Sequence, residues 1–156
     1  MANIRERKPL PQAFRMLSTQ AIMLHQAVAD TLKLNITDYK CMDLIARLGP
    51  MTAGKLAEES GLTTGAITGV VDRLEKAGYA KRTDNPNDRR SIIIELTLDK
   101  KKQKEYEGIF LPLERKLEKQ ASSYTSQELS RFIEFIQRTA EILREETIRL
   151  TKKSEN

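Results

Sequence analysis

Residues 62–97 read LTTGAITGVVDRLEKAGYAKRTDNPNDRRSIIIELT, and this stretch decides the fold. Its first half places apolar residues at helical spacing between Thr63, which is suited to capping a helix, and Gly78, which is suited to ending one. Its second half changes to strand spacing, because YAKRT and SIIIELT flank the turn-forming residues 85–90. One face of the second strand carries Ile92, Ile94 and Leu96. The stretch therefore predicts a helix that leads directly into a β-hairpin.

A shorter helix is predicted just before this one. Thr52 can cap the segment AGKLAEES, and Gly61 supplies a turn between the two helices. The outward face of the second helix is small and polar, with Thr64, Gly65, Thr68, Gly69, Asp72 and Arg73. Small residues allow a helix backbone to approach a surface, and threonine hydroxyls can hydrogen-bond base edges or phosphates. The two helices are typical either of a DNA-reading helix-turn-helix or of an ordinary helical hairpin with a solvated face.

The predicted β-hairpin is basic. Lys81, Arg82, Arg89 and Arg90 lie on or near it, and the last two are adjacent at its tip. A basic tip beside a groove-bound helix can place an arginine in the adjacent minor groove, where a narrow groove has enhanced negative potential. We expect Asp88 to hold Arg90 through a charge-assisted hydrogen bond and so to shape the tip. A solvated charged turn is the alternative, but it does not explain why the helix and the hairpin are basic together.

The same stretch resembles the winged helix-turn-helix of the MarR family of bacterial transcriptional regulators. Asp88-Arg89-Arg90 followed by Leu96-Thr97 fits the family's wing pattern, and Asn85-Pro86 fits its wing entry. The resemblance implies a mainly α fold with a small β-hairpin wing. It further implies one MarR-type domain over residues 1–156, with a DNA-binding lobe at 37–97 and dimerisation helices at 11–34 and 99–150.

Carried onto matching positions, the resemblance implies contacts with double-stranded DNA in two places. In the major groove it implies base and phosphate contacts by Thr63, Thr64, Gly65 and Thr68. In the minor groove it implies entry of Arg90, while Arg89 contacts phosphate or stays in solvent. Two further arginines are assigned to this surface, Arg82 on the hairpin and Arg73, which supports a DNA backbone contact or packs locally.

Helices are also predicted on both sides of this central unit. We expect one to open at Pro11, another to be capped by Thr37, and a last one to open at the capping box formed by Thr125 and Glu128. Glycine and proline within residues 108–112 predict a kink in the helical segment between them.

The first predicted helix and the last two carry apolar stripes that a small winged domain cannot cover. Two copies of the chain can bury these stripes against each other, and the family resemblance implies such a homodimer. A two-fold dimer reads a pseudo-palindrome with half-sites about one helical turn, ~34 Å, apart. A monomer whose terminal helices pack on its own core is the alternative.

The composition bounds the class of protein. The 156 residues suggest one domain, and the net charge of +5 favours an anionic partner. One cysteine excludes an internal disulfide, and one histidine excludes a zinc site built from several cysteines and histidines, so no metal or cofactor is expected. The sequence has no apolar run long enough to span a membrane and no apolar signal core, so we expect a cytoplasmic location. It also lacks a glycine-rich phosphate loop and a nucleophile elbow, so we do not expect an enzyme.

The resemblance also implies a small aromatic or phenolic acid bound between the dimer helices and the winged lobe. Phe14, Arg15 and His25 are candidates to line such a cleft, with Arg15 as the partner of the carboxylate. Cys41 lies on an apolar stripe and is expected to be a buried structural thiol, with redox sensing as the alternative. The predicted mechanism is repression, in which the dimer occupies an operator until a ligand releases it. Activation, ligand-independent regulation and a winged protein-interaction adaptor stay open as alternatives.

Overall fold

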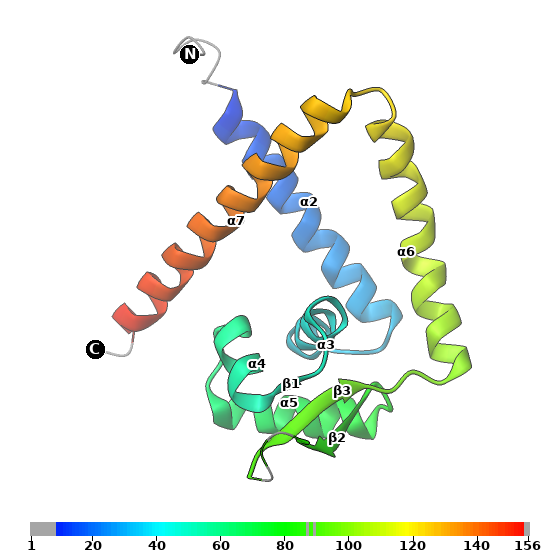
Figure 1. The fold of residues 1–156 in the computed structure, drawn as a ribbon, viewed down its shortest axis with the longest axis vertical. Helices are drawn as coiled ribbons and strands as arrows, with labels where there is room; N and C mark the ends of the chain where they lie inside the picture. Colours follow the sequence, from blue (N-terminus) through cyan, green and yellow to red (C-terminus); the bar gives the residue numbers. More distant parts are fainter. Residues whose placement is uncertain (1–8, 87, 89, 155–156) are drawn as a thin grey trace.

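The computed structural model describes residues 9–86, 88 and 90–154 (Figure 1). Its helices are α2 (Leu10–Thr31), α3 (Ile36–Leu48), α4 (Ala53–Ser60), α5 (Thr64–Lys76), α6 (Lys100–Ala121) and α7 (Ser126–Ser154). Its strands are β1 (Met51–Thr52), β2 (Ala80–Asp84) and β3 (Ile92–Leu96). The predicted fold class, mainly helical with a small β-wing, is confirmed.

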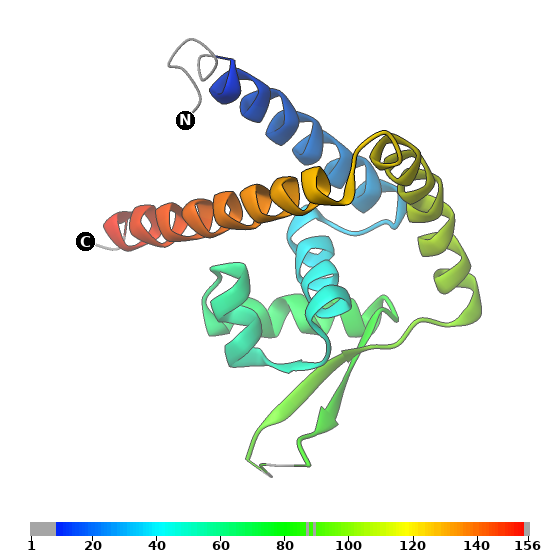
Figure 2. The ribbon, with the colours of Figure 1, turned by 45° about the horizontal axis from the view of Figure 1, so that its top comes forward.

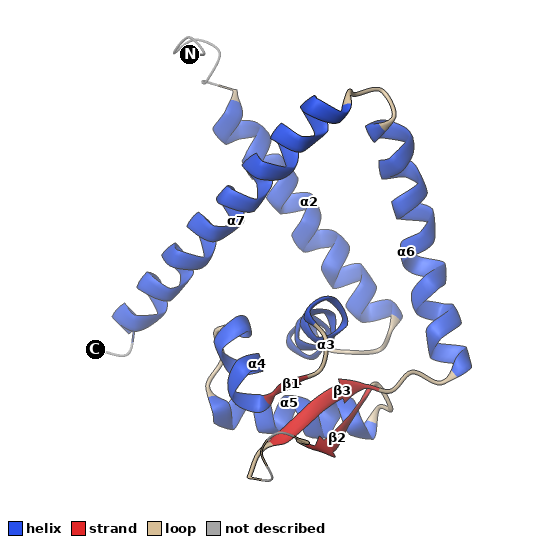
Figure 3. Cartoon of the chain, in the orientation of Figure 1, coloured by secondary structure: helices blue, strands red, loops and turns tan. Residues whose placement is uncertain are grey.

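The three short helices α3, α4 and α5 pack together with the sheet in one lobe (Figure 3). The recurring apolar positions of α5 face inward, and its buried side chains are Ile67, Val70, Val71 and Leu74. The C-terminal end of α2 closes this core from the other side, where Val28, Ala29 and Leu32 are buried. The lobe is therefore anchored to the rest of the molecule through the last turns of α2.

The remainder of α2, together with α6 and α7, extends away from the lobe (Figures 1 and 2). In Figure 1 α7 passes across α2, and Phe14 of α2 lines a crevice together with Phe135 of α7. No residue of α6 is buried, and the described side chains of α7 are all half-buried or exposed. Tyr106, Ile109 and Phe110 of α6 pack against the core of the lobe as half-buried side chains. The rest of the two apolar stripes has no core within the described part of this chain.

The sheet contains one more strand than the hairpin that the sequence predicts. Its order is β1-β3-β2, so β3 lies in the centre and pairs antiparallel with both neighbours. Ile94, which is 1% exposed, faces Met51 on one side and Arg82 on the other. The expectation of a two-stranded hairpin was incomplete because β1 has only two residues, too few to produce an alternating pattern.

Most of the predicted helix boundaries are confirmed, and one is wrong. The side chains of Thr52 and Thr63 cap α4 and α5, and Thr125 and Glu128 form the expected capping box. The cap of α3 is Asn35 rather than Thr37, because Asn35 Oδ1 accepts a hydrogen bond from the Asp38 N–H at 2.9 Å.

Three further predicted boundaries concern the turns and the long helices. Gly61 and Gly78 have φ of 73° and 71°, the left-handed conformation that a turn after a helix requires. α2 begins at Leu10, one residue before the predicted start at Pro11. α6 continues through Gly108 and Pro112 as one helix, and the kink expected within residues 108–112 stays a prediction.

The corrected cap of α3 gives a direct test. Replacing Asn35 by alanine removes the cap and also the hydrogen bond from Asn35 Nδ2 to Asp38 Oδ2 (2.6 Å), so we expect Asn35→Ala to lower the free energy of unfolding by about 1–2 kcal/mol. The matched variant Thr37→Ala should change it by less than about 0.5 kcal/mol. Urea unfolding measures both values. A larger loss for Thr37→Ala than for Asn35→Ala would contradict the structure.

Candidate nucleic-acid interface

The N-terminal half of α5 presents a small, exposed face away from the core. Thr64, Gly65 and Thr68 are exposed. Thr63 Oγ1 accepts a hydrogen bond from the Ala66 N–H at 3.2 Å, which leaves its own O–H free to donate. A Cβ added to Gly65 would meet no atom within 4 Å, so this position is open to the outside. The face can therefore approach a flat or grooved surface closely, as a recognition helix requires.

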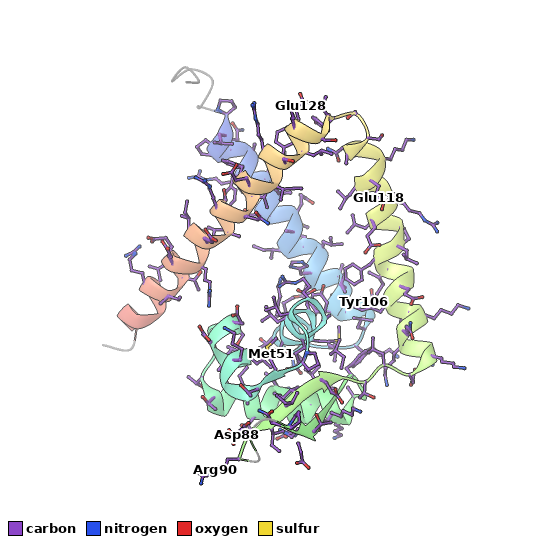
Figure 4. All side chains as sticks on the ribbon, viewed as in Figure 1. Met51, Asp88, Arg90, Tyr106, Glu118 and Glu128 are labelled. Atoms are coloured by element: carbon purple, nitrogen blue, oxygen red, sulfur yellow. The ribbon has the colours of Figure 1, made fainter. Side chains whose placement is uncertain are left out.

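The turn between β2 and β3 is shaped by hydrogen bonds among its own residues. Asp88 Oδ1 accepts from the backbone N–H of Arg90 at 3.0 Å, and the Asp88 carbonyl accepts from the Ser91 N–H at 3.0 Å. Asn85 Nδ2 donates to Ser91 Oγ at 2.7 Å. We expected Asp88 to hold Arg90, and the observed contact is with its backbone rather than with its guanidinium. Figure 4 shows the Arg90 side chain at the end of the wing, pointing away from the lobe.

The two predicted contact arginines on α5 and β2 are both engaged within the lobe. Arg73 Nε and Nη2 donate to the two carboxylate oxygens of Asp38 at 2.8 and 2.7 Å. This hydrogen bonding raises the pKa of Arg73. Arg82 contacts the carboxylates of Asp72 and Glu75. Local packing, one of the two roles expected for Arg73, thus has a specific partner, and DNA contacts by Arg73 and Arg82 stay predictions. Arg89 lies outside the described residues.

The side chains of the three predicted effector residues lie apart from one another in the described part of a single chain. Phe14 lies in a narrow apolar crevice between α2 and α7, together with Leu17, Phe135, Ile136, Thr139, Ala140 and Leu143. His25 is eleven residues further along α2, a distance of about 16 Å at 1.5 Å per residue. Arg15 is exposed and lines neither the crevice nor the surroundings of His25.

His25 instead belongs to a polar cluster between α2 and α3. Its Nδ1 lies 2.6 Å from Lys40 Nζ, and its ring lies 5.9 Å from the ring of Tyr39. Desolvation lowers the pKa of His25, and the Lys40 ammonium lowers it further. A neutral imidazole therefore accepts a hydrogen bond from Lys40, which holds this lysine at the edge of α3.

A cavity that the sequence reading missed lies on the same side of α3. It measures about 400 Å³ and extends between α3 and the corner where α4 meets α5. Its lining consists of Ile36, Thr37, Lys40, Cys41, Asp43, Leu44, Arg47, Glu59, Ser60 and Leu62. The signal was present in the spacing of Lys40, Asp43 and Arg47, which places these three charges on one face of a helix.

Cys41 lies beside this cavity as a buried side chain. Its residue is 0% exposed, and burial raises the pKa of the thiol to about 11. Oxidation requires a thiolate that peroxide can reach. The environment of Cys41 therefore favours the structural role over redox sensing.

The described part of the chain has neither a metal-binding cluster nor a membrane-spanning helix. Residues 9–86, 88 and 90–154 contain no cluster of three or more histidine, cysteine or acidic side chains placed to hold a metal ion. Within the same residues, no helix has both the length and the apolar character needed to cross a membrane.

Comparison with known proteins relates this geometry to a family. The family model described as "MarR family" matches residues 34–92. An uncharacterized HTH-type transcriptional regulator of Bacillus subtilis, YcgE, is 44% identical over 144 residues, which cover 92% of each chain. The multiple antibiotic resistance protein MarR of Salmonella typhimurium is 30% identical over 91 residues, or 58% of this chain and 63% of that protein.

Solved structures share the fold at lower identity. NadR in complex with 4-hydroxyphenylacetate aligns with a TM-score of 0.60 and 23% identity, covering 91% of this chain and 95% of that one. A MarR variant from E. coli complexed with operator DNA aligns with a TM-score of 0.55 and 21% identity, covering 89% and 99%. Both likenesses concern the whole architecture, including the long helices outside the lobe.

Proposed function

Since the chain belongs to the MarR family of DNA-binding transcriptional regulators, we propose that it is a homodimeric repressor that binds a pseudo-palindromic operator and is released by a small aromatic acid. It acts in the cytoplasm and has no catalytic role. Each copy inserts the N-terminal half of α5 into a major groove and the tip of its wing into the adjacent minor groove.

One observation carries the DNA-binding part of the proposal, and it concerns the charges of the hairpin. Lys81 pairs with Glu95 at 2.9 Å, and Arg82 pairs with Asp72 and Glu75. The Arg90 guanidinium, in contrast, contacts no carboxylate of the described residues, while its backbone is fixed by Asp88. An arginine whose backbone is held in place and whose guanidinium is left uncompensated at the end of a projecting turn suits a phosphate-lined groove.

Loss of the Arg90 guanidinium is expected to weaken operator binding by about 1–3 kcal/mol. The measurement is a footprint and a binding titration on DNA flanking the coding region of the protein, with wild type and Arg90→Ala. The control is Lys81→Ala, which removes a hairpin cation that is already paired within the sheet. It should weaken operator binding less than Arg90→Ala does. Equal losses for the two variants would show that the hairpin contributes only general positive charge.

The homodimer is supported by the apolar surface of the three long helices. Leu17 on α2 is 64% exposed and Ile136 on α7 is 60% exposed. Other apolar side chains exposed on these helices are Leu10, Met16, Ile22, Met23, Leu24, Leu111, Leu117, Phe132, Ile133, Phe135, Ile142, Leu143, Ile148 and Leu150. Soluble monomers rarely leave so many apolar side chains together in water. A second copy of the chain supplies the same stripes in a self-complementary arrangement.

Wild-type protein is expected to sediment at twice its chain mass of 17.8 kDa. Ile136→Glu should shift it toward the single chain, because a carboxylate buried in an apolar interface without a partner costs several kcal/mol. Gln127→Glu adds the same charge to the polar side of the same helix and should leave the dimer intact. Sedimentation of the wild type as a single chain would end this part of the proposal.

We place the effector site in the cavity on α3 rather than in a cleft at Phe14 and Arg15. Its volume of about 400 Å³ lies in the range of small-ligand pockets. Ile36, Leu44 and Leu62 offer apolar surface for a ring, and Lys40 offers a cation for a carboxylate. NadR was solved with 4-hydroxyphenylacetate, and a compound of this class has the matching ring and carboxylate.

Calorimetric titration with 4-hydroxyphenylacetate tests the placement of this site. Lys40→Met should weaken binding by about tenfold or more, because a charge-assisted contact is worth about 1.5–3 kcal/mol. Arg15→Ala should bind as the wild type does, since Arg15 does not line the cavity. Weaker binding by Arg15→Ala together with unchanged binding by Lys40→Met would return the site to the α2 cleft that the sequence suggests.

A further inference from the structure

Arg82 ties the wing to the recognition helix. We propose that it is a positioning residue, which fixes the angle between α5 and the β2–β3 hairpin, rather than a residue that contacts DNA. The inference rests on the proposed DNA-binding function and assigns one residue a different part in it.

The contacts of Arg82 run along α5 for more than one turn. Its backbone N–H donates to Glu75 Oε1 at 2.7 Å, and its guanidinium contacts the same carboxylate. Nη2 donates to Asp72 Oδ1 at 2.7 Å and lies 3.5 Å from the carbonyl oxygen of Thr68. Positions 68, 72 and 75 occupy one face of a helix. A single planar guanidinium therefore spans that face and opposes both sliding and rotation of the strand against the helix.

The charge around Arg82 does not suit a phosphate contact. Two carboxylates, those of Asp72 and Glu75, lie against one guanidinium, so the local sum of charges is negative. A DNA phosphate brought to this point would meet both acids. The Arg82 side chain is 34% exposed, less than the 54% of the neighbouring Lys81, because it lies along α5.

The position of the wing tip depends on the contacts of Arg82, because a small rotation of the hairpin at this residue displaces the distant tip by several ångströms. β2 pairs with β3 from Ala80 to Asp84, and Arg82 lies in the middle of that pairing, opposite Ile94. The tip lies about five residues beyond it, or about 16 Å at 3.3 Å per residue. A rotation of about 10° at Arg82 would therefore displace the tip by about 3 Å, enough to take Arg90 out of a groove that α5 still occupies.

A double-mutant cycle between Arg82 and Arg90 tests the role. The DNA is a duplex enriched from a randomised library by the wild-type protein. Arg90→Ala is expected to weaken binding to it by about tenfold. In an Arg82→Ala background the same change should cost less than about threefold, because the wing has already lost its alignment. If the losses of DNA affinity from Arg82→Ala and Arg90→Ala were additive, the positioning role of Arg82 would be overturned. An Arg82→Ala variant that binds DNA as the wild type does would overturn it too.

A second variant distinguishes the two interpretations by the sign of its effect. Glu75→Gln removes a negative charge, so an Arg82 that contacts phosphate would be released and binding would be unchanged or tighter. A positioning Arg82 loses a partner instead, so we expect binding about threefold to tenfold weaker. The control is Glu95→Gln, whose carboxylate is 30% exposed against 31% for Glu75 and is paired with Lys81 within the sheet. It should not weaken binding.

Two controls, the folding of each variant and the enrichment of DNA by the wild-type protein, separate the possible outcomes. Circular dichroism at the binding temperature confirms that each variant is folded. Partial unfolding would weaken all specific binding, and it would not selectively remove the effect of Arg90→Ala. A wild-type protein that enriches no sequence would remove the proposed DNA-binding function itself. An enriched sequence with tighter or unchanged binding by Glu75→Gln overturns the positioning role alone.

Discussion

The position of the recognition helix depends on one charged contact inside the lobe, the pairing of Arg73 with Asp38. Asp38 is 2% exposed, and removing a carboxylate from water costs several kcal/mol unless charged partners and hydrogen bonds compensate. Arg73 supplies two hydrogen bonds at 2.8 and 2.7 Å, and Asn35 supplies a third at 2.6 Å. Apolar side chains tolerate repacking, whereas a two-pronged contact with a buried acid has one geometry. α5 is therefore held in one register against α3.

Two arginines of the lobe, Arg73 and Arg82, hold its elements together. Arg73 ties α5 inward to α3, and Arg82 ties it outward to the wing. Each guanidinium is matched by carboxylates, so the net charge of +5 is not spread evenly over the surface proposed to meet DNA. The polar face of α5 itself has only small residues in its first two turns. The DNA affinity of such a surface depends on its shape and on the placement of a few charges. The angle between α5 and the wing therefore has a large effect on DNA binding.

The sequence predicted the parts of this fold that depend on local chemistry. The caps at Thr52 and Thr63 and the left-handed glycines follow from neighbours within four residues, so single-sequence reasoning can find them. The error at Thr37 has the same origin. Asn35 and Thr37 are both good caps, and the choice between them depends on the hydrogen bond that Asn35 makes to a buried acid.

Contacts between distant residues were beyond that reasoning. Asp38 and Arg73 are separated by 35 positions, and nothing in the sequence distinguishes Asp38 from an acid on a solvated face. The partners of Arg82 could not be predicted either, because they become visible only when β2 lies against α5. The effector candidates on α2 followed from the family resemblance, which implies a cleft beside the dimer helices but does not show which elements of this chain form its walls. The cavity on α3 needs α4 and α5 as walls.

The attachment of the lobe to the long helices indicates how a ligand can act on DNA binding. Val28, Ala29 and Leu32 bury the end of α2 in the lobe, whereas α7 reaches it through Arg144, whose Nη2 lies 3.6 Å from Glu58 and 3.7 Å from Glu59. Exposed ion pairs of this kind contribute little stability. The lobe is therefore held by the buried end of α2 and by the half-buried Tyr106, Ile109 and Phe110 of α6, but only by exposed ion pairs from α7. The weak contact with α7 permits a pivot about the junction of α2 and α3.

The proposed effector cavity lies on α3, the element at that pivot. One side of α3 holds α5 through Asp38, and another carries Lys40, which also contacts His25 on α2. A carboxylate that takes Lys40 as its partner competes with the His25 contact and so favours a different angle between α3 and α2. Because α5 follows α3 rigidly, and the wing follows α5, such a change moves the whole reading unit as one body. In a dimer that movement alters the spacing of two recognition helices, and a ligand shifts the equilibrium by its difference in affinity for the two spacings.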